Sequence, residues 1–164
     1  MPRMTHLIGA VLLLAVIPSA VAAQTATRED FQAWQTLMEG RWVGDVTWIA
    51  DWPGFGNKGD KVTAYIETVS IADGQGLISR FHGGNGTAHW VTMYDVGAKE
   101  IRTAAVNSGG GTGTSVISRE AEQWKARCSG SLADGTKTIA DLTLHVSDNG
   151  NTYLGAGPRR SAAR

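Results

Sequence analysis

The chain has very little cysteine, which excludes a disulfide framework. Cys128 is the only cysteine among 164 residues, so no intramolecular disulfide can form. Stability is therefore expected from a hydrophobic core, because a domain of this size buries roughly 70% of the surface of its unfolded chain. Alternation along the chain places Cys128 on one face with Trp124 and Ala126. This pattern favours a small buried hydrophobe over a nucleophile with a histidine partner, for which there is no local signature.

Charge is also scarce and balanced. Charged residues make up 18% of the chain, and 15 basic residues offset 15 acidic ones. This composition excludes a basic nucleic-acid-binding protein, an acidic tail and a disordered polyelectrolyte. Without Arg3 near the start and three arginines after residue 158, residues 24–153 carry a net charge of −4. A mildly acidic domain further disfavours a nucleic-acid partner.

No apolar run is long enough to span a membrane. The longest run covers residues 7–17 and is followed by Pro18, whereas a membrane-spanning helix needs about 20 apolar residues. Arg3 precedes the run, and the small residues 19–23 follow it. This arrangement is typical of a secretory signal peptide.

The first predicted segment is therefore a signal peptide over residues 1–23, with cleavage after Ala22 or Ala23. The mature protein is expected to be exported, either periplasmic or secreted, with no stable membrane insertion after cleavage. Residues 24–154 form the predicted folded domain.

Glycine, in contrast, is abundant. The 21 glycines are roughly twice the usual share of a chain and favour many tight turns. Before these turns, one helix is predicted over residues 28–39. A capping box at residues 27–30 starts it, apolar residues recur at spacings of three and four, and Gly40 ends it.

From Arg41 onward the apolar period changes to two, which indicates half-buried strands. Strands are predicted over residues 41–50, 61–71, 77–82, 87–94, 100–106, 114–119, 123–129 and 137–146, with turn signals between them. The predicted fold class is all-β, an antiparallel up-and-down barrel of about 8–10 strands with one short N-terminal helix.

The opening of the first strand carries a motif. Gly40, Trp42 and Gly44 form Gly-x-Trp-x-Gly directly after the helix. This resembles the entry motif of calycin-type barrels, and over residues 31–153 the chain is similar to small exported bacterial lipocalin-like barrels of unknown function. The resemblance implies that Trp42 seals one end of the barrel beneath the helix. Calycin-type barrels include the nitrobindin-like proteins. In this chain, however, Val46 replaces the third glycine of their motif, and no haem-ligand histidine follows His145.

The C-terminus departs from the pattern. Residues 155–164 contain two glycines and a proline, with no apolar alternation. We predict a disordered basic tail over these residues and a closing strand that is truncated.

Aromatic residues supply the candidate binding site. A barrel of this size either fills its interior with side chains or encloses a small ligand. The candidate ligand-binding residues come from the inward strand faces and from the glycine-rich loop after residue 50. They are Trp48, Trp52, Phe55, Trp90, Tyr94 and Trp124.

Other chemistry has weaker support. His82 and His89 flank a predicted turn and are the candidate haem or metal ligands, with no further ligand pattern near them. No nucleophile elbow and no complete phosphate-binding loop is present in the sequence.

The sequence therefore favours a non-catalytic, cofactor-free binding protein that holds a small hydrophobic or amphipathic molecule. Two alternatives are a haem- or metal-dependent redox or isomerase-type protein that uses His82 or His89 at the barrel mouth, and a fully packed structural barrel. The ligand and the oligomeric state are left open.

Overall fold

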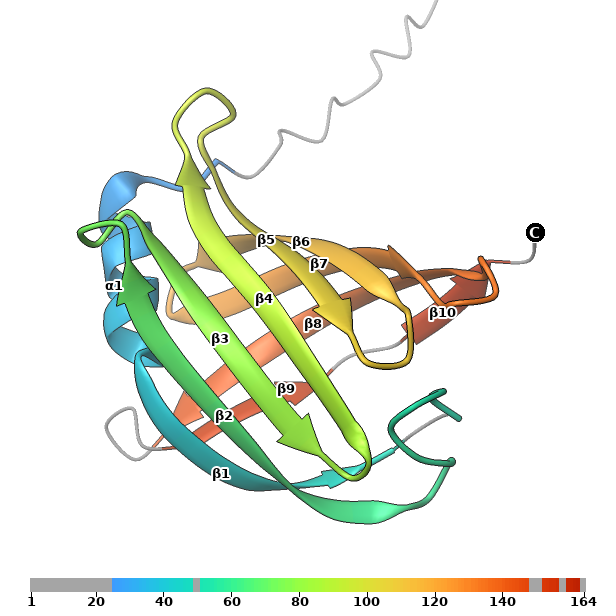
Figure 1. Ribbon diagram of the computed structural model, residues 1–164. Coiled ribbons are helices and arrows are strands. Elements are labelled where there is room, and N and C mark those ends of the chain that lie inside the picture. Colours follow the sequence, from blue (N-terminus) through green and yellow to red (C-terminus); the bar gives the residue numbers. More distant parts are fainter. Residues whose placement is uncertain (1–24, 49–50, 148–151, 157–158, 163–164) are drawn as a thin grey trace, which may run out of the picture.

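The computed structural model describes residues 25–48, 51–147, 152–156 and 159–162, and side chains as far as residue 145 (Figure 1). The predicted signal peptide lies outside these residues. Within the described residues, no helix has both the length and the apolar content to cross a membrane.

One helix precedes the sheet. α1 spans Arg28–Met38, and its N-terminus has a complete capping box. The Thr27 hydroxyl accepts the Asp30 backbone N–H at 3.1 Å, and the Asp30 carboxylate accepts the Thr27 backbone N–H at 2.9 Å. These bonds satisfy backbone donors that a helix start otherwise leaves unpaired.

The rest of the described chain is a single antiparallel sheet. Its strands are β1 Gly40–Thr47, β2 Lys61–Ile71, β3 Gly76–Gly83, β4 Gly86–Asp95, β5 Glu100–Asn107, β6 Thr112–Glu120, β7 Gln123–Ser131, β8 Lys137–Ser147, β9 Thr152–Ala156 and β10 Arg159–Ala162. Each strand from β1 to β8 pairs with the next in sequence, and β9 and β10 both pair with β8. The sheet curls around an inner face, with α1 at one end (Figure 1).

This architecture confirms the predicted fold class, an all-β up-and-down meander with one short helix. The predicted strands agree with the observed ones to within a few residues. The period-two pattern was sufficient because each strand has one face toward the core and the other toward solvent.

The C-terminal residues differ from the prediction. β9 and β10 lie on the same side of β8 in one register, since Thr152 is opposite Ser147 and Ala162 is opposite Lys137. Residues 155–156 and 159–162 are therefore strand, whereas a disordered tail was predicted. Backbone hydrogen bonds to the free edge of β8 do not require alternating apolar side chains, so the sequence pattern gave no signal of this pairing.

The two edges of the sheet run in the same direction. Successive strands are antiparallel, so β1 and the β9–β10 segment, first and ninth in the meander, are parallel to each other. Among the described residues, β1 pairs only with β2. Joining the edges would require a parallel ladder, which the hairpin connections of a meander do not produce.

The hydrophobic core lies at the α1 end. Phe31, Trp34 and Met38 of the helix pack on inward side chains of the sheet. The sheet contributes Leu77, Ile101, Ile117, Trp124, Ala126 and Leu144, all at most 7% exposed. Burial of this apolar stripe stabilises a helix that is too short to be stable alone.

Candidate functional site

The inner face is defined as the face of the sheet on which the core lies. Directly opposite residues in an antiparallel ladder share a face, so the register extends this face from the helix end to the other end of each strand. On β4 it carries Trp90 and Tyr94, and on β7 it carries Trp124 and Cys128.

Two of the six predicted ligand residues belong to the packed core. The Tyr94 ring lies 6.5 Å from the Phe31 ring, and its hydroxyl donates to the Ala26 carbonyl at 3.1 Å. The Trp124 ring is 5.1 Å from the Trp34 ring, and the side chain is 6% exposed. The structure therefore places both rings at the helix end, Trp124 within the core and the partly exposed Tyr94 packed against it.

The other four predicted ligand residues lie together at the opposite end. We call Trp48, Trp52, Phe55, Phe81 and Trp90 the aromatic cluster. Its ring centroids are 5.6 to 6.5 Å apart along a continuous chain of contacts. Most of these contacts are edge-to-face or tilted, the geometry that aromatic quadrupoles favour.

Phe81 is the member that the sequence reasoning missed. It contacts Trp48, Phe55 and Trp90, and so joins the loop to the sheet. The signal was available, since the predicted strand over residues 77–82 alternates and puts Phe81 on the same face as Leu77.

The loop that contains Trp52 and Phe55 packs across two turns of the sheet. Phe55 is 5% exposed, and its carbonyl accepts the Asn85 backbone N–H at 3.3 Å. A Cβ at Gly86 would overlap the Phe55 ring, and a Cβ at Gly109 would overlap the Pro53 carbonyl. Glycines at these turns therefore allow the loop to cover the end of the sheet.

Burial of the inner face varies beside the aromatic cluster. The inward hydroxyl residues Thr68, Ser79 and Thr92 are at most 3% exposed, whereas Trp42, Ile66 and the cluster residue Trp90 have intermediate exposure. On β5–β8 the partly exposed inward residues are small or aliphatic: Thr103, Ala105, Gly113, Ser115, Cys128, Gly130, Thr138, Ala140 and Leu142. Large rings on β1–β4 and small side chains on β5–β8 thus share one inner face.

The Gly-x-Trp-x-Gly tryptophan lies on this face. The Trp42 indole N–H donates to the Met38 carbonyl at the end of α1, at 3.1 Å. The side chain is half-buried rather than part of the fully buried core. Trp42 therefore anchors the end of the helix, while Trp34 and Trp124 form the packed layer beneath it.

One buried polar atom in the aromatic cluster has no hydrogen-bond partner among the described residues. Among the described residues, none accepts a hydrogen bond from the Trp48 indole N–H, although the nitrogen itself is buried. A buried donor without an acceptor costs free energy. A ligand oxygen that reached this nitrogen would remove that cost.

The histidines lie elsewhere. His82 is opposite Thr87 and His89 is opposite Arg80, and both histidines are exposed on the outer face of the β3–β4 hairpin. They therefore lie on the opposite face of the sheet from the aromatic cluster. No group of three or more metal-ligating side chains occurs among the described residues.

The single thiol faces inward and is poorly reactive. Burial raises the pKa of the Cys128 thiol, and the nearby Asp141 carboxylate raises this pKa further, against a lowering hydrogen bond with Ser115. The thiol is therefore protonated at neutral pH, and a protonated thiol is a weak nucleophile.

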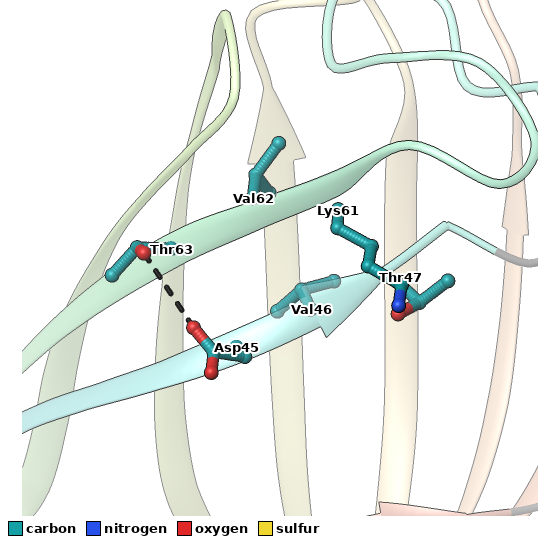
Figure 2. Close-up of a pocket in the computed structure, with 6 residues that line it drawn as sticks. All are labelled: Asp45, Val46, Thr47, Lys61, Val62 and Thr63. Atoms are coloured by element: carbon teal, nitrogen blue, oxygen red, sulfur yellow. Dashed lines mark hydrogen bonds between the residues drawn. The ribbon is translucent and has the colours of Figure 1, made fainter.

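A hollow of about 410 Å³ lies at the far end of the β1–β2 ladder (Figure 2). Asp45, Val46, Thr47, Lys61, Val62 and Thr63 line it. The Thr63 hydroxyl donates to the Asp45 carboxylate at 3.5 Å. Its lining comes from only these two neighbouring strands and includes Val46 and Val62, which lie on the inner face in phase with Trp42 and Ile66.

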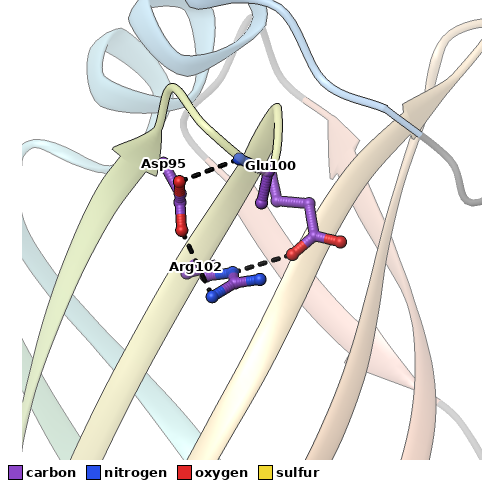
Figure 3. Close-up of polar contacts among 4 residues, drawn as sticks. Asp95, Glu100 and Arg102 are labelled. Atoms are coloured by element: carbon purple, nitrogen blue, oxygen red, sulfur yellow. Dashed lines mark hydrogen bonds and ion pairs between the residues drawn. The ribbon is translucent and has the colours of Figure 1, made fainter.

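A charged network closes the β4–β5 hairpin at the helix end (Figure 3). The Arg102 guanidinium lies 2.7 Å from Glu100 and 3.2 Å from Asp95. Asp95 also accepts the Ala98 backbone N–H at 2.9 Å, and this bond is the main reason why its pKa lies below its ordinary value. In the same turn, the Lys99 carbonyl accepts a hydrogen bond from the Ala26 backbone N–H at 2.8 Å.

Comparison of the chain with protein-family models, with curated proteins and with solved structures gives no match.

Proposed function

We propose that the protein binds a small, uncharged, largely apolar molecule on the inner face, between the core and the aromatic cluster. The observation that carries the proposal is the partial exposure of inward residues there, Trp42, Ile66 and Trp90 among them. In a fully packed barrel these side chains would be buried by one another, as those at the helix end are.

The lining supports an apolar ligand with a flat ring. Trp90 and Phe81 offer partly exposed rings within one chain of aromatic contacts. Several inward residues of β5–β8, among them Ala105, Gly113 and Gly130, are small. Binding sites for small molecules are lined mostly by apolar and aromatic groups, with a few polar groups that fix orientation.

Charge on the inner face supports an uncharged ligand. Among the described inward residues of β4–β8, Arg119 is the only charged one, and its guanidinium lies 5.7 Å from the Trp124 ring at the helix end. The polar groups nearer the aromatic cluster are neutral, with hydroxyls at Thr103, Ser115 and Thr138. A bound carboxylate would find no cation there to offset its desolvation.

The test is a fluorescence titration with a neutral, polarity-sensitive naphthalene ketone, with a fatty acid and haem as comparison ligands. We expect the ketone to show a blue-shifted emission and to quench tryptophan fluorescence. The fatty acid should quench tryptophan fluorescence less or not at all. Trp90→Leu should weaken ketone binding by about tenfold, since aromatic anchors dominate binding energy.

Tyr65→Leu is the matched control, because Tyr65 is 58% exposed and lies on the outer face of β2. It should bind like the wild type. A ketone that shows no shift, or equal losses in the two variants, would exclude binding at the inner face.

The family and the compartment belong to the same proposal. The Gly40–Trp42–Gly44 opening and the meander topology support membership of the calycin-type barrels. The charge and apolar pattern of residues 1–23 supports export by a cleaved signal peptide. N-terminal sequencing of the protein from its native cells should start at Ala23 or Gln24, and an intact Met1 would contradict export by this route.

A further inference from the structure

The free edge of β1 lacks three features that protect edge strands, namely proline, lysine and a β-bulge. β1 has eight residues, and all eight pair with β2 in one unbroken register without a bulge. It contains no proline and no lysine. Long, regular edges of this kind are templates for another strand, and proteins normally interrupt them.

The side chains of β1 are complementary to a second copy of β1. If two β1 strands pair antiparallel with Val43 opposite Val43, then Arg41 of each copy lies opposite Asp45 of the other. On the other face, Trp42 of each copy lies opposite Gly44, and Gly40 lies opposite Val46. Charge meets opposite charge, and the large ring meets the residue without a side chain.

The edge of β1 is accessible at these positions. A Cβ built at Gly44 or at Gly40 would meet nothing within 4 Å, so no neighbouring atom crowds either glycine. Val43 is 69% exposed, and the Arg41 side chain is 86% exposed.

We infer that β1 is a homodimer interface, in which two copies join edge to edge through antiparallel β1 strands around a two-fold axis at Val43. The two sheets then form one continuous sheet. An isologous contact of this kind uses the edge of both copies and closes at two. Pairing β1 with the β9–β10 edge of another copy would instead extend without limit.

The interface is one strand pair and therefore small, so the dimer should be weak. Sedimentation velocity of the mature chain up to about 0.5 mM should show a monomer–dimer equilibrium, as small interfaces give. Val43→Arg should raise the dissociation constant at least about tenfold, since it places two like charges at the axis.

Val106→Arg is the matched control. Val106 is also an exposed valine, 54% exposed, but β5 is paired on both sides. This variant should dimerise like the wild type. Circular dichroism of both variants checks that the sheet is intact. A wild type that stays monomeric, assemblies larger than dimers, or a Val43→Arg dimer of unchanged strength would each overturn the inference.

Cross-linking tests the register. In a Cys128→Ala background, Val43→Cys should form an intermolecular disulfide under mild oxidation, whereas Thr47→Cys should not. Thr47 lies at the end of β1, far from the axis in this register. Equal cross-linking at both positions would overturn the pairing about Val43.

Discussion

Single residues differ sharply in how much they contribute to this fold, and the tryptophans show it. Trp124 is 6% exposed, packs on Trp34, and lies beneath the Arg119 guanidinium. Trp42 is half-buried and has one hydrogen bond to Met38. The Gly-x-Trp-x-Gly sequence emphasises Trp42, but burial assigns the larger stabilising role to Trp124.

We therefore expect Trp124→Ala to lower the free energy of unfolding by about 3–5 kcal/mol, as large-to-small changes in a core do. Trp42→Ala should cost clearly less, because part of its surface is already in water. Urea unfolding of both variants measures the difference. A larger loss for Trp42→Ala would mean that the motif ring, rather than the Trp34–Trp124 pair, seals the helix end.

Among the elements, the β4–β5 hairpin has the best-defined electrostatics. The Asp95 carboxylate accepts the Ala98 N–H and faces Arg102, and both interactions lower its pKa, the Ala98 bond by more. Because the folded-state pKa is lower than the unfolded one, the carboxylate stabilises the fold at pH values above 3.8, its ordinary pKa. This stabilisation is lost as the pH falls through the folded-state pKa.

An NMR titration of the side-chain carboxyl carbon should therefore place the pKa of Asp95 below its ordinary value. Arg102→Gln should raise this pKa only in part, since the Ala98 N–H remains. If Arg102→Gln restored the ordinary value completely, the ion pair rather than the backbone bond would be the main cause.

The sequence was most informative about the secondary-structure elements. The helix and the eight strands of the meander follow from local periodicity. Alternation alone also predicts that Leu144 faces inward and that His145 faces outward. The aromatic cluster could be predicted only in part. Phe55 is buried because the Gly86 turn, 31 residues further along the chain, lies against its ring. Tyr94 packs against the core and Trp90 belongs to the aromatic cluster because α1 packs over one end of the sheet. No local sequence pattern indicates where α1 packs.

For the whole molecule, the C-terminal segment is the main difference from the sequence-based expectation. Ending the chain at Ala156 removes β10, whose four residues pair with β8. We expect Tm to fall by about 2–4 °C for each kcal/mol lost, as in domains of this size. A disordered tail would leave Tm unchanged.

Arg159→Ala combined with Arg160→Ala is the control for this truncation, because it keeps the backbone that pairs with β8. Its Tm, measured by differential scanning calorimetry, should stay close to that of the wild type. A drop equal to that of the truncation would assign the effect to the two charges instead.

The described sheet has nine strand positions, because β9 and β10 share one, and this odd number determines where a fused domain would lie. β1 begins at the α1 end, and β10, the last part of the ninth strand, finishes at the end that carries the aromatic cluster (Figure 1). A reporter domain fused after the C-terminus would therefore crowd the aromatic end, whereas one fused before α1 would stand at the opposite end. A circular permutant would need a linker as long as the sheet itself, which an even-stranded barrel with neighbouring termini would not need.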